Sequence, residues 1–126
     1  MSVFIIISVF TQVSAQSEND YADFIQSLIG GQREYSVQSG RVDLLTDKYA
    51  FEIEWANKWK ESIGQSLWYA VQTNKKPGII LLMRNKSDYK YFIQLNTALE
   101  YADLVDKVRV HIFPNDFEKL IEETKN

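Results

Sequence analysis

Apolar residues recur along this chain in two spacings, one typical of helices and one typical of strands. Tyr21, Ile25 and Leu28 repeat at helical spacing near the start, whereas residues 79–83 form a continuous apolar run, as expected of a strand covered on both faces. The same reasoning predicts helices and strands in the order helix, three strands, helix, strand, helix, strand, helix, at residues 17–29, 32–37, 41–46, 49–55, 56–73, 79–83, 89–104, 108–113 and 117–124. This order predicts an α/β fold with helices on both sides of a mixed sheet.

The polar pair Asp47-Lys48 separates two apolar runs and predicts a tight turn between two antiparallel strands. With a two-residue loop, Asp43 falls opposite Glu52. Strand alternation then divides the hairpin between two faces. One face is expected to carry Val42, Leu44, Phe51 and Ile53, and the other Arg41, Asp43, Glu52 and Glu54.

Asp43 and Glu52 would place like charges opposite each other, which costs a few tenths to about 1 kcal/mol. A divalent cation would remove this cost, and Mg²⁺ commonly takes one or two protein carboxylates together with water and phosphate oxygens. The alternative is a solvated sheet face on which Arg41 neutralises an acid diagonally. These residues alone leave both interpretations open.

The segment 56–73 carries two stripes at helical spacing. The apolar stripe consists of Trp59, Ile63, Leu67, Ala70 and Val71. The neighbouring stripe consists of Lys58, Ser62, Gln65 and Tyr69. Because this helix begins directly after the strand that holds Glu52 and Glu54, it must fold back against the sheet. We therefore expect Lys58, Gln65 and Tyr69 to overhang the acids.

In sequence order, these candidates are Asp43, then Glu52-Ile53-Glu54, then a helix with Gln65-Ser-Leu-Trp-Tyr69. The pattern resembles the PD-(D/E)XK nuclease superfamily, in particular its branch with a QxxxY motif. The resemblance covers roughly residues 32–83 and implies a restriction-endonuclease-like αβββαβ core. It also implies a metal-dependent nuclease that hydrolyses phosphodiester bonds of nucleic acid, with DNA the expected substrate.

The resemblance implies that Asp43 and Glu52 bind Mg²⁺ or Mn²⁺ and that Gln65 and Tyr69 position the site and the nucleic acid. One position departs from the family, because Glu54 stands where the family has its lysine. Lys58 is the expected replacement, since it shares a helical stripe with Gln65. The segment also resembles small uncharacterised bacterial and phage proteins in which an E-x-D/E strand precedes a helix with K-W and G-Q-x-x-x-Y.

Glu34 is a further candidate. It would be either a third metal ligand or an acid that contacts the ligands without binding the metal itself. An even-length loop after the strand at 32–37 would put Glu34 on the same face as Asp43 and Glu52. A loop of odd length would turn it to the other face.

Composition and charge limit which kinds of metal site and nucleic-acid contact this chain can form. The 126 residues suit one domain with its own core, and the absence of cysteine excludes disulfides and thiolate metal sites. A single histidine, His111, argues against a zinc cluster. The net charge of −3 counts against avid coating of nucleic acid, although local cations could still follow a phosphate path. The candidates for such a path are Lys58, Lys60, Lys75, Lys76, Arg84 and Lys86.

Residues 1–15 form a short apolar run that ends in Val13-Ser-Ala15 and predicts a signal peptide cut after Ala15, although it has no Lys or Arg near its start. The run is too short for a comfortable membrane span. The mature domain would then be 16–126, secreted or periplasmic, without stable insertion in a membrane. An extra buried strand or a mistaken start codon are the alternatives, and the protein would then be cytoplasmic.

Two other functions remain open. The substitution of Glu54 for the family's lysine allows a catalytically inactive binding module that keeps the nuclease fold. The acids could also hold a stabilising cation in a secreted structural domain. The dependence of cleavage and of thermal stability on a divalent metal separates these three functions.

Overall fold

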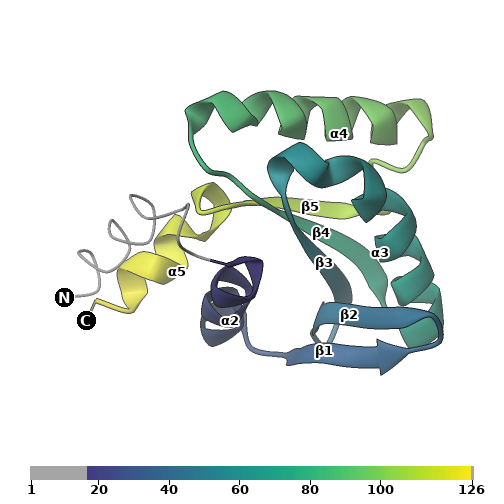
Figure 1. Ribbon diagram of the computed structural model, residues 1–126, viewed down its shortest axis with the longest axis horizontal. Coiled ribbons are helices and arrows are strands. Elements are labelled where there is room, and N and C mark those ends of the chain that lie inside the picture. Colours follow the sequence, from purple (N-terminus) through teal and green to yellow (C-terminus); the bar gives the residue numbers. More distant parts are fainter. Residues whose placement is uncertain (1–16, 126) are drawn as a thin grey trace.

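The computed structural model describes residues 17–125, and the predicted signal peptide at 1–15 lies outside them. The described chain is an α/β domain with a five-stranded mixed sheet flanked by helices (Figure 1). In chain order the elements are α2 (Glu18–Ile29), β1 (Gln32–Val37), β2 (Gly40–Leu45), β3 (Tyr49–Trp55), the 3-10 turn η2 (Ala56–Lys58), α3 (Trp59–Thr73), β4 (Lys76–Leu82), η3 (Lys86–Asp88), α4 (Tyr89–Tyr101), β5 (Arg109–Phe113), η4 (Asn115–Phe117) and α5 (Glu118–Glu123). The predicted order of elements is confirmed. No helix among the described residues is long and apolar enough to cross a membrane.

The sheet follows the chain, with strand order β1-β2-β3-β4-β5. β1, β2 and β3 form an antiparallel meander, and β3, β4 and β5 run parallel. The two parallel crossovers contain α3 and α4, because parallel neighbours need a long connection. β4 begins at Lys76, earlier than predicted, because its parallel register pairs Lys76 with Tyr49 and Pro77 with Ala50.

Two apolar cores lie on opposite faces of the sheet. One core joins Phe51, Ile53 and Ile80 to residues of α2 and α5, such as Ile25 and Ile121. The other core packs β4 and β5 against α3 and α4, and it includes residues such as Ile79, Leu81, Leu95 and Leu99. Figure 1 shows α3 and α4 on one side of the strands and α2 and α5 on the other. The alternating side chains of β3 and β4 therefore bury both faces, as the apolar run 79–83 predicted.

The helical stripe predicted for α3 is confirmed for most of its residues but is wrong at one end. Val71 is 71% exposed, whereas Ser66 is fully buried. The helix thus turns a small polar residue toward the sheet where the apolar pattern predicted only larger side chains. Because the Ser66 side chain is small, α3 can pack close to the strands beneath it.

The β2–β3 ladder opens at Asp43. Below this point Leu44 pairs with Phe51 and Leu45 with Ala50, and the register then stops. Beyond this point the Asp43 side chain replaces a backbone acceptor of the ladder. Its Oδ2 accepts a hydrogen bond from the backbone N–H of Ile53 at 2.8 Å. The opening lies beside β3, where the candidate acids are.

The opening also overturns one prediction of the strand alternation. Val42 does not share a face with Leu44; it packs with Ala50 and Tyr69, toward α3. On β1, Glu34 stands opposite Asp43 by register and adopts a left-handed backbone with φ of 54°. β1 and β2 are thus both redirected at the same level of the sheet, which simple two-residue periodicity cannot predict.

Candidate functional site

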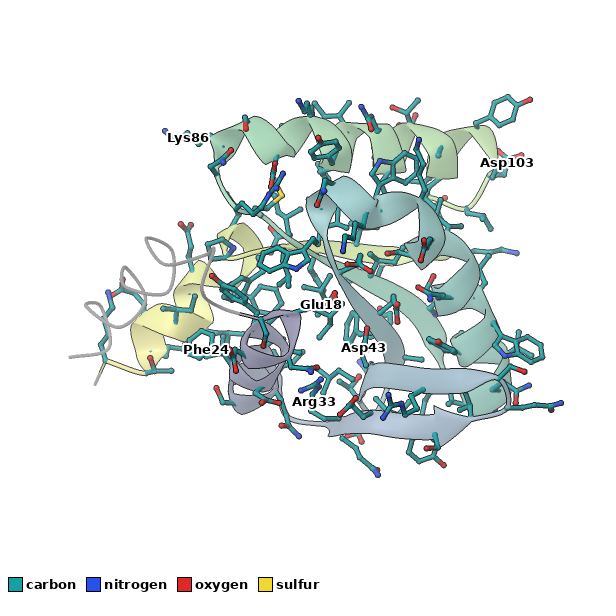
Figure 2. All side chains as sticks on the ribbon, in the orientation of Figure 1. Glu18, Phe24, Arg33, Asp43, Lys86 and Asp103 are labelled. Carbon is teal, nitrogen blue, oxygen red and sulfur yellow. The ribbon has the colours of Figure 1, made fainter. Side chains whose placement is uncertain are left out.

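Four carboxyl groups from three different elements gather at the opening between β2 and β3. They belong to Glu18 at the start of α2, Asp43 of β2, and Glu52 and Glu54 of β3. The side chains of Asp43 and Glu52 are in hydrogen-bond contact, and so are those of Glu18 and Glu54. Figure 2 shows Glu18 and Asp43 near the middle of the molecule, between α2 and the edge of the sheet. We call these four residues the acid cluster.

Burial and mutual repulsion make ionisation of the acid cluster costly. Burial, the hydrogen bond to Asp43 and the negative charges of Asp43, Glu54 and Glu18 together raise the pKa of Glu52 to about 10, and burial has the largest effect. Burial and the hydrogen bond to Glu54 raise the pKa of Glu18 to about 8. Without a compensating cation, the cluster therefore holds protons at neutral pH.

Four buried side-chain oxygens of the described chain lack hydrogen-bond partners, two of them in the acid cluster and two on α3. These atoms are Glu18 Oε2, Glu52 Oε1, Ser62 Oγ and Gln65 Oε1. A buried oxygen without a partner costs about 1–3 kcal/mol, so such a group indicates a missing neighbour. Carboxylate and amide oxygens are the ligands that Mg²⁺ and Mn²⁺ prefer. The carboxyl oxygens of the acid cluster therefore fit a hard divalent cation.

The carboxyl groups are not already spread around a common point. Within residues 17–125, no three Asp, Glu or His side chains are arranged as the ligands of one ion. They contact each other in pairs instead, as carboxyl groups do when they share protons. A cation would have to replace those protons, and the side chains would have to rotate toward it.

Helix α3 brings Tyr69 to the same place, as predicted. Tyr69 is 7% exposed and packs on Val42 and Ala50, and its hydroxyl accepts a hydrogen bond from the Arg41 backbone. Burial raises the pKa of Tyr69, and the charges of Glu52 and Asp43 act in the same direction. Tyr69 therefore lies within electrostatic reach of the acids, where it also supports the hairpin.

The contact between Tyr69 and the hairpin gives a testable prediction at Gly40. A Cβ on Gly40, whose φ is 158°, would lie 2.7 Å from the Tyr69 hydroxyl oxygen. We expect Gly40→Ala to destabilise the protein by about 1–3 kcal/mol because the Tyr69 ring must move. Urea unfolding measures this change.

Gly64→Ala is the matched control on α3, since nothing lies within 4 Å of its added Cβ. That variant should be neutral or more stable by about 0.5–1 kcal/mol. Equal stability of Gly40→Ala and the wild type would show that Tyr69 does not press on the turn.

Lys58 lies at the junction of η2 and α3 and is solvent-exposed. Its positive charge acts on Glu18, whose pKa it lowers against the other influences. It makes no ion pair within 4 Å among residues 17–125. The charge of Lys58 is thus near the cluster, with its ammonium group free to turn toward a phosphate.

Glu54, which stands where the PD-(D/E)XK pattern has a lysine, makes other contacts. Its Oε1 accepts a hydrogen bond from the Trp55 backbone N–H at 2.9 Å, and its carboxyl contacts Glu18. The cluster is therefore more acidic than the PD-(D/E)XK pattern alone implies.

Glu34 is not brought to the cluster. Its left-handed backbone turns the side chain outward, where 46% of it is exposed and its carboxylate lies 3.4 Å from Arg41. The register did place it opposite Asp43, but the strand alternation behind that prediction does not hold at this residue. The geometry gives Glu34 no place among ligands that include Asp43 and Glu52.

Glu18, and not the predicted Glu34, is the further acid that lies beside Asp43, Glu52 and Glu54. The other acids near the start of α2 are engaged elsewhere: Asp20 completes a capping box with Ser17, and Asp23 forms an ion pair with Arg33. The sequence signal was therefore an acidic helix start with one more acid than capping requires.

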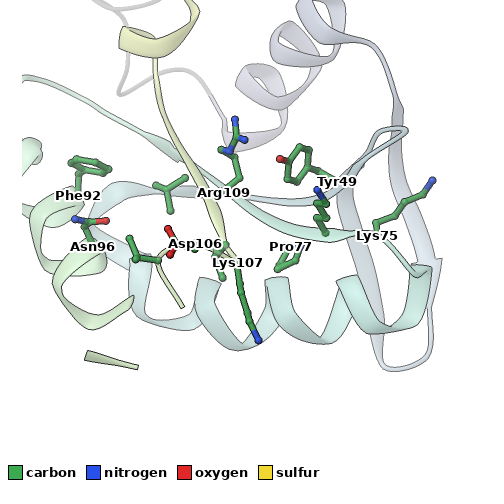
Figure 3. Close-up of a pocket in the computed structure, with 12 residues that line it drawn as sticks. Tyr49, Lys75, Pro77, Phe92, Asn96, Asp106, Lys107 and Arg109 are labelled. Carbon is green, nitrogen blue, oxygen red and sulfur yellow. The ribbon is translucent and has the colours of Figure 1, made fainter. Parts of the chain in front are cut away.

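The predicted basic path is divided between separate parts of the surface. Arg84 is held by Asp88 through hydrogen bonds of 2.9 and 3.0 Å. Lys75 and Lys76 line a cavity of about 630 Å³ at the amino ends of the parallel strands, together with Lys107 and Arg109. Figure 3 shows Arg109 and Lys107 of this cavity pointing in different directions. These cations do not form one continuous track to the acid cluster.

Comparisons with known proteins give two relatives. The chain is 44% identical over 55 residues to one KilA-N domain-containing protein of Acanthamoeba polyphaga mimivirus, and 33% identical over 58 residues to another. The matches cover 44% and 46% of this chain but only 15% and 24% of the two viral proteins. The chain therefore corresponds to a small part of each relative. No protein-family model and no solved structure matches it.

Proposed function

We propose that this protein is a metal-dependent nuclease whose acid cluster binds Mg²⁺ or Mn²⁺. The observation that supports this proposal most strongly is the pair of buried, unpartnered carboxyl oxygens at Glu18 and Glu52, together with the raised pKa values of these two groups. Asp43 and Glu52 would hold the cation, with Glu18 facing them from α2. When bound there, a divalent cation would supply Lewis-acid chemistry, polarising a scissile phosphate and lowering the pKa of an attacking water.

The protein's own residues would divide the remaining work. Lys58, exposed and unpaired within residues 17–125, would neutralise charge that develops on the phosphate. Gln65 would orient water or phosphate with its side-chain amide. Tyr69 would fix the β1–β2 turn and hold Asp43 and Glu52 in place through its packing on Val42 and Ala50.

Nucleic acid is the proposed partner on two grounds. Both relatives are named as KilA-N domain-containing proteins, and this likeness suggests a nucleic-acid-binding role. The acid cluster, with a cation bound and Lys58 beside it, also suits a phosphodiester. DNA is therefore the first substrate to test.

The test is incubation of the purified protein with plasmid, linear duplex and single-stranded DNA, each with Mn²⁺, with Mg²⁺ and with EDTA. The nuclease proposal predicts fragments only in the presence of the metal. Uncut DNA in every reaction, with protein that is folded by circular dichroism, would contradict it.

A second candidate is a binding module without catalysis, which the Glu54 substitution and the exposure of Lys58 favour. Such a module would gain thermal stability from the metal and would bind DNA without cutting it. A structural cation site would gain stability in the same way, with no affinity for DNA.

Lys58 provides a specific prediction. Lys58→Ala should lower metal-dependent cleavage by about 10²-fold, because the charge that compensates the phosphate is lost. Single-turnover cleavage rates measure this loss. Lys119→Ala, which removes an exposed lysine of α5, is the control and should keep the wild-type rate. Full activity of Lys58→Ala would remove Lys58 from the mechanism.

A further inference from the structure

A second cavity, of about 520 Å³, lies at the carboxyl ends of β4 and β5. Its lining consists of Met83, Asn85, Lys86, Tyr89, Pro114 and Asn115. The Met83 N–H donates to the Phe113 carbonyl at 3.0 Å, which fixes the end of β4 beside the start of η4. The volume is in the range of small-ligand sites, roughly 300–1,000 Å³. We call this the β4–β5 cavity.

The chemistry of the lining suits a planar, polar-edged ring. Met83, 7% exposed, gives an apolar floor, and Tyr89, which is 48% exposed, stands at the edge. Lys86 and Asn115 make no side-chain hydrogen bond or ion pair with residues 17–125. Asn85 Oδ1 accepts from the Ser87 N–H at 2.9 Å, so its NH₂ group is left to donate. An aromatic face with amides and one ammonium group matches a nucleobase with its phosphate.

The position of the cavity connects it to the acid cluster. Leu82, the residue before Met83, pairs with Trp55 of β3. Trp55 directly follows Glu54 and lies three residues before Lys58. The cavity and Glu54 of the acid cluster thus both lie near the carboxyl ends of the parallel strands, the side where open α/β sheets bind ligands. Figure 2 shows Lys86 where the chain leaves β4 and enters α4.

We propose that the β4–β5 cavity binds an unpaired base of a single-stranded nucleic acid whose backbone continues to the acid cluster. The base stacks on Tyr89, its edge meets Asn85 and Asn115, and Lys86 contacts the adjoining phosphate. A duplex keeps its bases stacked and paired, so it cannot offer the ring face that Tyr89 binds. This inference rests on the proposed function for its substrate, and it specifies that substrate as single-stranded.

The test is fluorescence anisotropy with a labelled single-stranded 12-mer, its abasic analogue and the matching duplex, all in EDTA so that nothing is cut. The wild type should bind the 12-mer about tenfold or more tightly than the abasic strand. Tyr89→Ala should lose that preference, whereas Tyr89→Phe should keep it because the ring remains. Tyr101→Ala is the matched control, since Tyr101 is 94% exposed at the other end of the same helix.

The outcomes separate this inference from the nuclease proposal, because binding needs no cleavage. A preference for bases that Tyr89→Ala abolishes supports the cavity even if the protein cuts nothing. Equal binding of the 12-mer and the abasic strand by the wild type would overturn it, even if the protein cuts DNA. Equal effects of Tyr89→Ala and Tyr101→Ala, or weaker binding by Tyr89→Phe equal to that of Tyr89→Ala, would overturn it as well. Thermal unfolding confirms that each variant is folded.

Discussion

Asp43→Asn is expected to lower metal-dependent DNA cleavage by about a thousandfold or more. Loss of one negative ligand weakens the binding of the cation, which supplies several kcal/mol of transition-state stabilisation. Each 1.4 kcal/mol of lost stabilisation lowers the rate about tenfold. The asparagine oxygen can still accept the hydrogen bond from Ile53 N–H, so the ladder opening should survive. The measurement is the cleavage rate at saturating Mn²⁺, with circular dichroism as a check of the fold.

Asp47→Asn is the control, because Asp47 is an exposed acid in the turn of the same hairpin. This substitution also removes one negative charge, about four residues away in sequence and outside the acid cluster. The variant should cleave DNA at the wild-type rate. Comparable losses in Asp43→Asn and Asp47→Asn would point to net charge, and wild-type activity of Asp43→Asn would contradict the proposed mechanism.

Glu52→Gln is expected to stabilise the metal-free protein at alkaline pH, with an effect on the order of 2–3 kcal/mol near pH 8.5. Burial and the neighbouring charges raise the pKa of Glu52 to about 10, against 4.5 for an ordinary glutamate. Between these values the unfolded chain has lost its proton while the folded chain keeps it. The stability contributed by Glu52 is therefore fully present below about pH 4.5 and falls as pH rises toward 10.

Urea unfolding at pH 5.5 and 8.5, in EDTA, measures this prediction. The wild type should lose stability between the two values, and Glu52→Gln should lose much less, since glutamine does not ionise. Glu61→Gln, which removes an exposed acid of α3, should follow the wild type. The same decrease in Glu52→Gln as in the wild type would show that Glu52 is ionised in the folded metal-free protein.

The fold could be predicted largely from local patterns. The Asp47-Lys48 turn fixed which residues of β2 and β3 face each other, and the observed pairing of Leu44 with Phe51 agrees with that register. The helix after β3 had to return over the sheet, which brought Tyr69 near the acids. Turn chemistry and periodicity act over a few residues, so they are readable from the chain itself.

The rest of the site depends on contacts between distant segments. Glu18 meets Glu54 only because α2 packs beside the opening of the sheet, 36 residues away in sequence. Glu34 lies outside the cluster because its backbone is left-handed, and the neighbouring residues in the sequence do not predict that conformation. Val42 changes face because the Asp43 side chain replaces a ladder bond. Each departure is a tertiary effect at the point where β2 separates from β3.

The most direct measurement is calorimetric titration of the metal-free protein with Mn²⁺ at pH 7.5, in two buffers of different ionisation enthalpy. If the acid cluster holds protons until a divalent cation replaces them, the wild type binds Mn²⁺ and the heat depends on the buffer because protons are released. Glu52→Gln should then bind far more weakly. No binding by the wild type, or equal binding by Glu52→Gln, would contradict the assignment of the cluster as a metal site.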